Sequence, residues 1–231
     1  MPDLLSMAIP YGIKKYLMTF VKASFLYFWA TSGLILTRRI FKKPLVERRH
    51  ELPFFLNFLR LRGNGVEVGV WKGEYSEHLL KYSKLSTLFS VDPWKEFDKK
   101  IYNDADNIPQ DEYEKIAEMV INKLRKYGKR SRVIRKASYE ASSLFGDSTL
   151  DFIYIDANHS YEACKEDLEF WWKKLKIGGV FAGHDFRDGQ LSNGNYGVKR
   201  AVTEFTRSHR QRLFITFEKD WPTWYLVRTD N

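Results

Sequence analysis

Imidazole and carboxylate side chains stand directly after two short apolar runs in the second half of the chain. The run LDFIYI is followed by Asp156 and His159, and the run VFAG is followed by His184 and Asp185. Carboxylate and imidazole groups together can ligate a divalent cation such as Mg²⁺ or Mn²⁺. An imidazole can also take a proton from a hydroxyl near neutral pH. The alternative is that both histidines only support the carboxylates through hydrogen bonds, without a metal.

A second group of residues follows the apolar runs in the first half. VEVGVWKG carries Glu67, Gly69 and Gly73, and Asp92 ends the next run, 25 residues after Glu67. Glycines there let a ligand approach the backbone, and an acid at the second position typically accepts hydrogen bonds from a ribose diol. Ser138, after a third run, falls where an adenine could be held. The group predicts an adenosine-containing ligand, with tight turns and a capping Asp as the alternative.

Strand-like and helical segments alternate along the chain from residue 51. Their order predicts a Rossmann-like, doubly wound and mostly parallel sheet of seven strands, closed by a C-terminal antiparallel pair and covered by helices on both faces. Ligands bind beyond the carboxyl ends of such strands, so the residues above are expected to line one cleft. The predicted strands are 66–70, 88–91, 132–135, 150–155, 180–183, 213–217 and 224–227, and the predicted helices are 51–62, 74–83, 110–126, 161–175 and 198–207.

The positive charge of the chain is concentrated at its N-terminus. Nine Lys and Arg against two acidic residues in residues 1–50 leave only +2 of the net charge of +9 for the rest. We therefore expect a basic, aromatic-rich helical extension (1–50) before the domain (51–231), and nucleic acid is not an expected partner. The uncharged stretch ASFLYFWATSGLILT (23–37) is shorter than the roughly 20 residues of a spanning helix. Whether residues 16–37 enter an anionic membrane surface or pack on the domain stays open.

The bulk composition is that of an ordinary folded protein, with 44% hydrophobic and 29% charged residues. Cys164 is the single cysteine, so an intramolecular disulfide is excluded and a reducing compartment is favoured. We expect a cytoplasmic location, either free or peripheral on the inner face of a membrane. Assembly as a homo-oligomer is left open.

Four phrases of the chain resemble the class I S-adenosylmethionine-dependent methyltransferases, over residues 63–228. The likeness is closest to the branch of the macrocin-type sugar O-methyltransferases and the cephalosporin-hydroxylase-like proteins. The phrases are VEVGVWKGEYS, SVDPW, DFIYIDANHSYEACKEDLEFW and LKIGGVFAGHDF.

The resemblance implies S-adenosylmethionine as the cofactor, contacted by Glu67, Gly69 and Asp92, with Asp92 on the ribose; Gly73, Ser138 and Asp156 are added as expected contacts. It also implies Asp156, with the pair at 184–185, as magnesium ligands and His159 as the general base beside Asp156. Related metal-dependent members carry a Glu-Asp pair where this chain has His184-Asp185. Imidazole suits transition metals better than Mg²⁺, which leaves the metal open.

The expected activity is O-methylation of a hydroxyl on a sugar, a glycan or another small molecule, assisted by a metal. The loop DANHSY after the fourth strand differs from the N/D-P-P-Y-like loops that accompany amino-group methylation, which favours oxygen as the acceptor. The insertion at 95–109 is either an acceptor-binding lid or a solvated loop. The alternatives are an RNA methyltransferase that uses the basic N-terminus and a non-catalytic cofactor-binding module.

Overall fold

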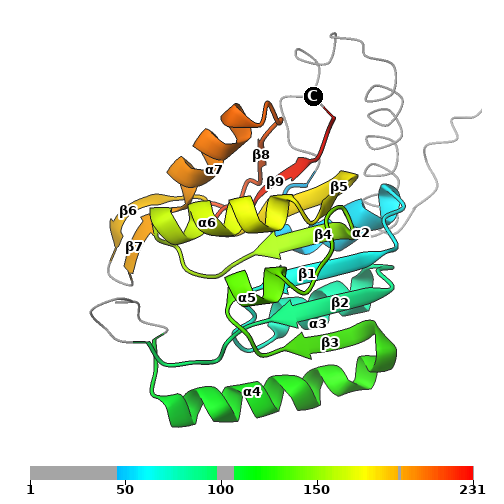
Figure 1. Cartoon of the computed structure of the whole chain (residues 1–231), viewed down its shortest axis with the longest axis vertical. Coiled ribbons are helices and arrows are strands. Elements are labelled where there is room, and N and C mark those ends of the chain that lie inside the picture. Colours follow the sequence, from blue (N-terminus) through cyan, green and yellow to red (C-terminus); the bar gives the residue numbers. More distant parts are fainter. Residues whose placement is uncertain (1–45, 98–106, 192–193, 231) are drawn as a thin grey trace, which may run out of the picture.

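The computed structural model describes residues 46–97, 107–191 and 194–230 (Figure 1). Nearly all of the predicted extension, including residues 16–37, and most of the predicted acceptor lid lie outside these ranges. Within the part of the chain that is described, no helix is both long enough and apolar enough to cross a membrane.

The main sheet has seven strands within the described ranges, in the order β3-β2-β1-β4-β5-β9-β8. The first five strands are parallel, whereas β9 runs antiparallel to β5 and β8 antiparallel to β9. This confirms the predicted Rossmann-like sheet with its C-terminal antiparallel pair. The strands are β1 (Asn64–Val68), β2 (Thr87–Val91), β3 (Ser131–Ile134), β4 (Leu150–Ile155), β5 (Leu175–Gly183), β8 (Phe214–Ile215) and β9 (Trp224–Val227).

Helices cover both faces of the sheet (Figure 1). β4 shows why: all six of its residues are buried, and neighbouring side chains point to opposite faces. Phe152 and Tyr154 join the apolar cluster under α2, α3 and α4, whereas Ile153 and Ile155 join the cluster under α5, α6 and α7. The helices are α2 (Leu52–Phe58), α3 (Glu74–Tyr82), α4 (Gln110–Leu124), α5 (Ser138–Ser142), α6 (Tyr161–Trp172) and α7 (Val198–Ser208), with 3-10 turns η2 (Arg49–Glu51) and η3 (Arg125–Arg130).

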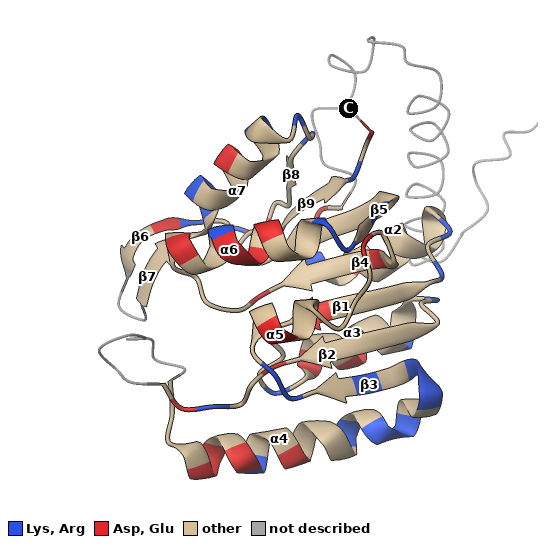
Figure 2. Cartoon of the chain, in the orientation of Figure 1, with Lys and Arg blue, Asp and Glu red and all other residues tan. Residues whose placement is uncertain are grey.

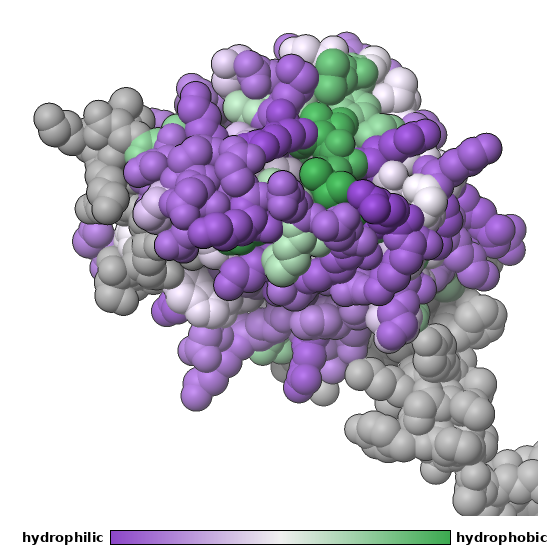
Figure 3. All heavy atoms as spheres, turned by 90° about the horizontal axis from the view of Figure 1, so that it is seen from below, coloured by the Kyte–Doolittle hydropathy of each residue, from purple (hydrophilic) through white to green (hydrophobic). Residues whose placement is uncertain are grey.

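The outer helix α4 shows how charge supports an element that packs on one side only. Its first turn carries Asp111 and Glu112, and its last turn and η3 are basic, so both ends complement the helix dipole (Figure 2). Its buried stripe includes Tyr113 and Val120. The surface seen from this side is mostly hydrophilic (Figure 3).

Three details of the predicted elements are wrong. The helix expected at 161–175 ends at Trp172, and β5 begins at Leu175 because that residue pairs with Leu150 in β4. The glycines at 178 and 179 therefore lie inside a strand rather than at a helix end. The lead-in helix expected at 51–62 ends at Phe58. The antiparallel hairpin of β6 (Asp188–Leu191) and β7 (Gly194–Gly197), together with the short α5, has no counterpart in the prediction.

Residues 46–50 pack on the domain, although they were assigned to the extension. Val46 is 1% exposed within the apolar cluster under α2, and its N–H donates to the Tyr225 hydroxyl at 3.2 Å. The N–H of Phe217 donates to the Glu47 carbonyl at 2.9 Å. Residues 46 and 47 therefore anchor this short segment against the C-terminal part of the chain.

The ends of β1 and β4 approach each other so closely that only glycine fits at position 69. Its φ is +84°, and a Cβ there would lie 1.9 Å from the backbone oxygen of Asp156. Gly178 has a similar φ of +80° but nothing within 4 Å of a Cβ. The two positions share a backbone conformation and differ in the space around it.

We expect Gly69→Ala to lower the free energy of unfolding by roughly 3 kcal/mol or more, because backbone strain and a backbone clash add. The matched control Gly178→Ala should cost about 1–2 kcal/mol, the strain of a left-handed alanine alone. Urea denaturation measures both values. Equal losses would show that the contact between the two strand ends is not a constraint.

Candidate functional site

Backbone hydrogen bonds between neighbouring segments continue past the ends of the parallel strands. The residues that directly follow β1, β2, β4 and β5 still donate their backbone N–H groups to the last residue of a neighbouring strand, so these four residues form one row at the carboxyl edge. The bonds are Gly69 to Val91 at 2.9 Å, Asp92 to Ile134 at 3.1 Å, Asp156 to Val68 at 2.7 Å and His184 to Ile155 at 3.0 Å.

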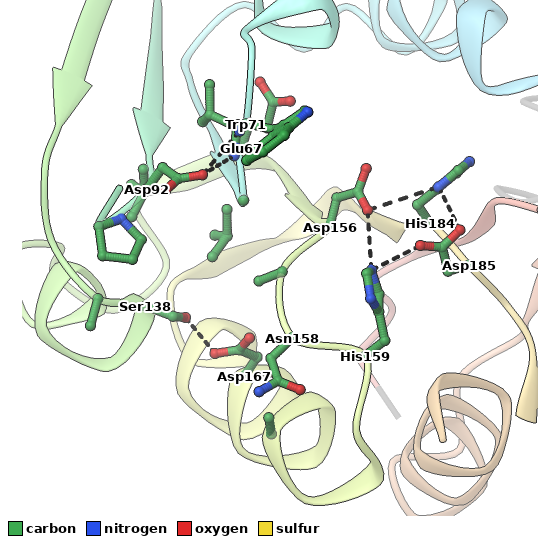
Figure 4. Close-up of a pocket in the computed structure, with 18 of the residues that line it drawn as sticks. Glu67, Trp71, Asp92, Ser138, Asp156, Asn158, His159, Asp167, His184 and Asp185 are labelled. Carbon is green, nitrogen blue, oxygen red and sulfur yellow. Dashed lines mark hydrogen bonds and ion pairs between the residues drawn. The ribbon is translucent and has the colours of Figure 1, made fainter. Parts of the chain in front are cut away.

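A cavity of about 890 Å³ opens along this edge. It lies near the upper end of the usual range for small-molecule sites, which is roughly 300–1,000 Å³. The cleft expected from the sequence therefore exists. Figure 4 shows its two halves, one around Asp92 and Ser138 and the other around Asp156 and His159. Gly73 does not line it but precedes α3 as its N-cap. The predicted residues that do line it are Glu67, Gly69, Asp92, Ser138, Asp156, His159, His184 and Asp185.

Asp92 is held by three backbone N–H groups. One carboxylate oxygen accepts from Val70 and Trp71, both at 2.9 Å, and the other accepts from Trp94 at 2.8 Å. Burial raises the pKa of Asp92, and these hydrogen bonds oppose that shift. A carboxylate has about four acceptor positions, so one remains for a ligand. The turn after β1 and the end of β2 are thus tied together by the side chain predicted to bind a ribose.

Three of the six non-glycine residues with positive φ in the described ranges follow strands at this edge. Trp71, Trp94 and Asp185 have φ of 51°, 41° and 53°, in the left-handed region that bulky side chains rarely adopt. They follow β1, β2 and β5. Such conformations are found where the surrounding structure over-determines them, often at functional sites.

Glu67 lies beneath the turn, 2% exposed. The Ser76 hydroxyl donates to its carboxylate and lies 2.7 Å from the Ser90 hydroxyl. Burial raises the pKa of Glu67 to about 8, against the opposing hydrogen bond of Ser76. Near neutral pH this carboxyl group is therefore largely protonated.

Ser138, which also lines the cavity, is engaged within the protein. Its oxygen accepts from the Trp171 indole N–H at 2.9 Å, and its hydroxyl donates to Asp167 (Figure 4). Asp167 also lines the cavity; it is 7% exposed, and burial raises its pKa to about 7. Sequence reasoning missed Asp167, because an acid within the helix of residues 161–172 carries no signal of its own.

The four residues after β4 and β5 form one cluster (Figure 4). His159 Nε2 lies 2.8 Å from Asp185 Oδ2 and 3.7 Å from Asp156 Oδ1. His184 Nδ1 lies 2.8 Å from Asp185 Oδ1 and 3.8 Å from Asp156 Oδ1. The predicted convergence is therefore observed. The Ser160 hydroxyl, which accepts from the Ala163 N–H at 3.3 Å, starts α6 and ends the loop that carries His159.

Burial and charge act in opposite directions in this cluster. Burial raises the pKa of Asp185, but hydrogen bonds from His159 and His184 outweigh it and hold that pKa well below its ordinary value. Burial lowers the pKa of His184, but its hydrogen bond to Asp185 and the charges of both carboxylates outweigh it, so the pKa is raised. Asp185 is thus an ionised carboxylate between two imidazoles.

Arg49 reaches the cluster from η2, and no sequence pattern indicates this. Its Nη1 lies 3.4 Å from Asp156 Oδ2, and its guanidinium lies 5.0 Å from the centre of the Tyr75 ring. It stands in the run ERRH, which reads as surface charge. Only the packing of residues 46–50 brings it inside.

Carboxylate and imidazole groups of the kind found in the cluster can ligate a divalent cation, but the carboxylate oxygens of the cluster already have nitrogen partners. Single donor atoms of Asp156, His184 and Asp185 lie within 4.8 Å of one another. Each of the four carboxylate oxygens, however, already faces a nitrogen of Arg49, His159 or His184. The predicted cation therefore stays a prediction, and the arrangement as it stands does not fit one.

Aromatic rings line the cavity beside the cluster. Tyr196, from the hairpin that was not predicted, stacks on His159 with ring centres 4.8 Å apart, and Trp221 lies 5.3 Å from Tyr196. Trp71 and Tyr75 line the same cavity. Such surfaces suit the apolar faces of a flat or sugar-like molecule.

Residues 66–186, just over half of the chain, match a family described as methyltransferase domain. The chain therefore belongs to this methyltransferase-domain family. An uncharacterised protein of Sinorhizobium fredii is 35% identical over 72 residues, which are 31% of this chain and 8% of that protein. The chain thus spans only a small part of that relative.

Solved structures share the fold at low sequence identity. A protein of Corynebacterium glutamicum has a TM-score of 0.54 at 12% identity, covering 93% of this chain and 91% of that one. The cofactor-bound protein Rv0187 from MTB has a TM-score of 0.53 at 14% identity, covering 98% and 94%. An rRNA methylase from Streptococcus thermophilus has a TM-score of 0.50 at 13% identity, covering 73% and 88%.

Glu67 should make stability depend on pH. Its folded pKa of about 8 exceeds its ordinary value of 4.5, so its contribution to stability is fully present below pH 4.5 and is lost as pH rises through 8. Relative to Glu67→Gln, the unfolding free energy of the wild type should fall by up to about 1.4 kcal/mol per pH unit across this window. Urea denaturation from pH 5.5 to 8 measures the difference, with exposed Glu112→Gln as control. Parallel curves for the wild type and Glu67→Gln would contradict the shift.

Proposed function

We propose that this chain transfers a methyl group from S-adenosylmethionine to a hydroxyl of a sugar, a glycan or another small molecule. The observation that supports this most directly is the cluster of His159, Asp156 and Asp185 inside the cavity. A hydroxyl is a weak nucleophile until it loses its proton. Two carboxylates within 4 Å of His159 Nε2 stabilise the positive charge that the imidazole gains when it acts as a base.

The cofactor half of the cavity fits an adenosine-containing molecule. Asp92 keeps one acceptor position free beside the turn after β1, and Asp167 provides a buried carboxyl group at the far end. When bound, S-adenosylmethionine supplies an activated methyl group. The chain's part is to orient the donor and exclude water, and orientation accounts for much of the rate of such transfers.

The acceptor half lies against the cluster and the rings of Tyr196 and Trp221. A hydroxyl placed beside Asp156 would hydrogen-bond to its carboxylate and pass its proton to Nε2 of the neutral His159, which leaves an imidazolium beside Asp185. Asp185, held ionised, stabilises the positive charge that the imidazole gains. The ring stack of His159 on Tyr196 fixes the orientation of the imidazole. These contacts support an acceptor with one apolar face and one hydroxyl-bearing edge, as sugars have.

Binding of S-adenosylhomocysteine to the full chain tests the cofactor half. We expect micromolar affinity by isothermal titration, and Asp92→Ala should weaken it at least tenfold, because the turn after β1 loses its anchor. Asp111→Ala, which removes an exposed acid paired with Lys115 at 3.0 Å on α4, is the matched control. Melting curves separate lost affinity from lost folding. Absence of binding to a folded wild type would overturn the proposal.

His159→Ala tests the acceptor half. Methyl transfer, followed as S-adenosylhomocysteine released with a panel of sugar acceptors, should fall by about 10²–10⁴-fold, the usual loss of a general base. Affinity for S-adenosylhomocysteine should stay within about twofold. His78→Ala, on α3 and outside the cavity lining, is the control. Comparable losses of turnover and affinity would assign His159 a structural role instead.

A further inference from the structure

Within the described part of the chain, Arg49 is the cation beside the cluster that comes from outside the residues of the family match, 66–186. Its side chain is 26% exposed, and its Nη1 lies 3.4 Å from Asp156 Oδ2. Nothing in the proposed proton transfer uses it. Its position beside Asp156, one of the predicted metal ligands, calls for an explanation.

The guanidinium is held in place by packing on several sides. The Tyr75 hydroxyl donates to the Arg49 carbonyl at 3.1 Å, and the guanidinium carbon lies 5.0 Å from the centre of the same ring. Three residues earlier, Val46 is buried in the core and its N–H donates to Tyr225. The backbone on both sides of the side chain is therefore anchored, and Arg49 is not a surface side chain that happens to fold inward.

The carboxylates that a divalent cation would need are already compensated. Asp185 faces His159 and His184 at 2.8 Å each, through different oxygens. Asp156 faces both imidazoles through Oδ1 at 3.7 and 3.8 Å and faces Arg49 through Oδ2. The imidazoles can give up their protons to make room for a metal, but a guanidinium stays charged at any working pH. Arg49 is thus the fixed positive charge of the site.

We propose that Arg49 takes the place of a divalent cation at Asp156, so that the centre of this chain works without a metal. The guanidinium supplies positive charge and N–H donors at the place where the oxygen of a methyl acceptor would develop negative charge. This role of Arg49 rests on the proposed function above. A second cation on Asp156 would meet the repulsion of the first. The positive charge of Arg49 is then the reason why this site differs from the metal ligation expected from the sequence pattern.

Titration of the full chain with Mn²⁺ alone, followed by the electron paramagnetic resonance of the free ion, tests this without any acceptor. The wild type should bind Mn²⁺ no more tightly than millimolar. Arg49→Gln removes the charge and should bind it at least tenfold more tightly, and Arg49→Gln/Asp156→Asn should lose that gain. Arg49→Lys keeps the charge and should resemble the wild type. Arg48→Gln, at the exposed neighbouring arginine, should also resemble it.

Micromolar Mn²⁺ binding by the wild type would overturn the proposal, and so would equal affinities of the wild type and a folded Arg49→Gln. If Arg49→Gln fails to fold by its melting curve, the wild-type titration still decides. Titration of the same samples with S-adenosylhomocysteine keeps the two proposals apart. A wild type that binds neither Mn²⁺ nor S-adenosylhomocysteine would discard the methyl-transfer function and the role of Arg49 toward an acceptor, whereas the exclusion of the metal by Arg49 would stand.

Discussion

The contact on which the rest of the site depends is the backbone approach of β1 to β4 at their carboxyl ends. The Asp156 N–H donates to the Val68 carbonyl at 2.7 Å, while the Asp156 carbonyl oxygen occupies the space that a Cβ of residue 69 would need. Because Gly69 has no side chain, the chain can turn away from β1 there and leave the edge of the sheet open. Asp156 then projects its carboxylate into the space that the turn vacates. The absence of a side chain at Gly69 thus allows the two strand ends to lie close together, with Asp156 in the cavity lining.

Charge is the second constraint, since a carboxylate taken out of water must be paired. The two halves solve this differently. Asp92 is paired with three neutral N–H groups, which fix a loop and leave acceptor capacity for a ligand. Asp156 and Asp185 are paired with cationic or protonatable groups, and for Asp185 the two imidazoles hold the pKa well below its ordinary value. Glu67, without such a partner, keeps its proton instead. The pKa values of Glu67 and Asp185 therefore move in opposite directions because their partners differ.

Much of this edge was predictable because strands buried on both faces leave a strong pattern. β4 was placed with its observed bounds, and the acids and histidines after β1, β2, β4 and β5 were expected to converge. The failures have physical causes. The helix before β5 ended early because Leu175 pairs with Leu150, a long-range contact that outweighs the glycine signal at 178–179. The hairpin carrying Tyr196 has few apolar residues. Asp167 and Arg49 look like solvated charges, since their burial depends on packing that no local pattern encodes.

Arg49, which adds a positive charge beside Asp156, lies outside the part of the chain that matches the family. The residues of the family match supply most of the parallel strands β1 to β5, the turn after β1 and the cluster after β4 and β5. Arg49 comes from the segment before them, which the domain holds through Val46 and the C-terminal strands β8 and β9. A change in that segment could add or remove a positive charge at Asp156 without disturbing any strand. The electrostatics of a methyltransferase centre can therefore be altered from outside the fold that builds it, which is why the fold alone does not define the reaction.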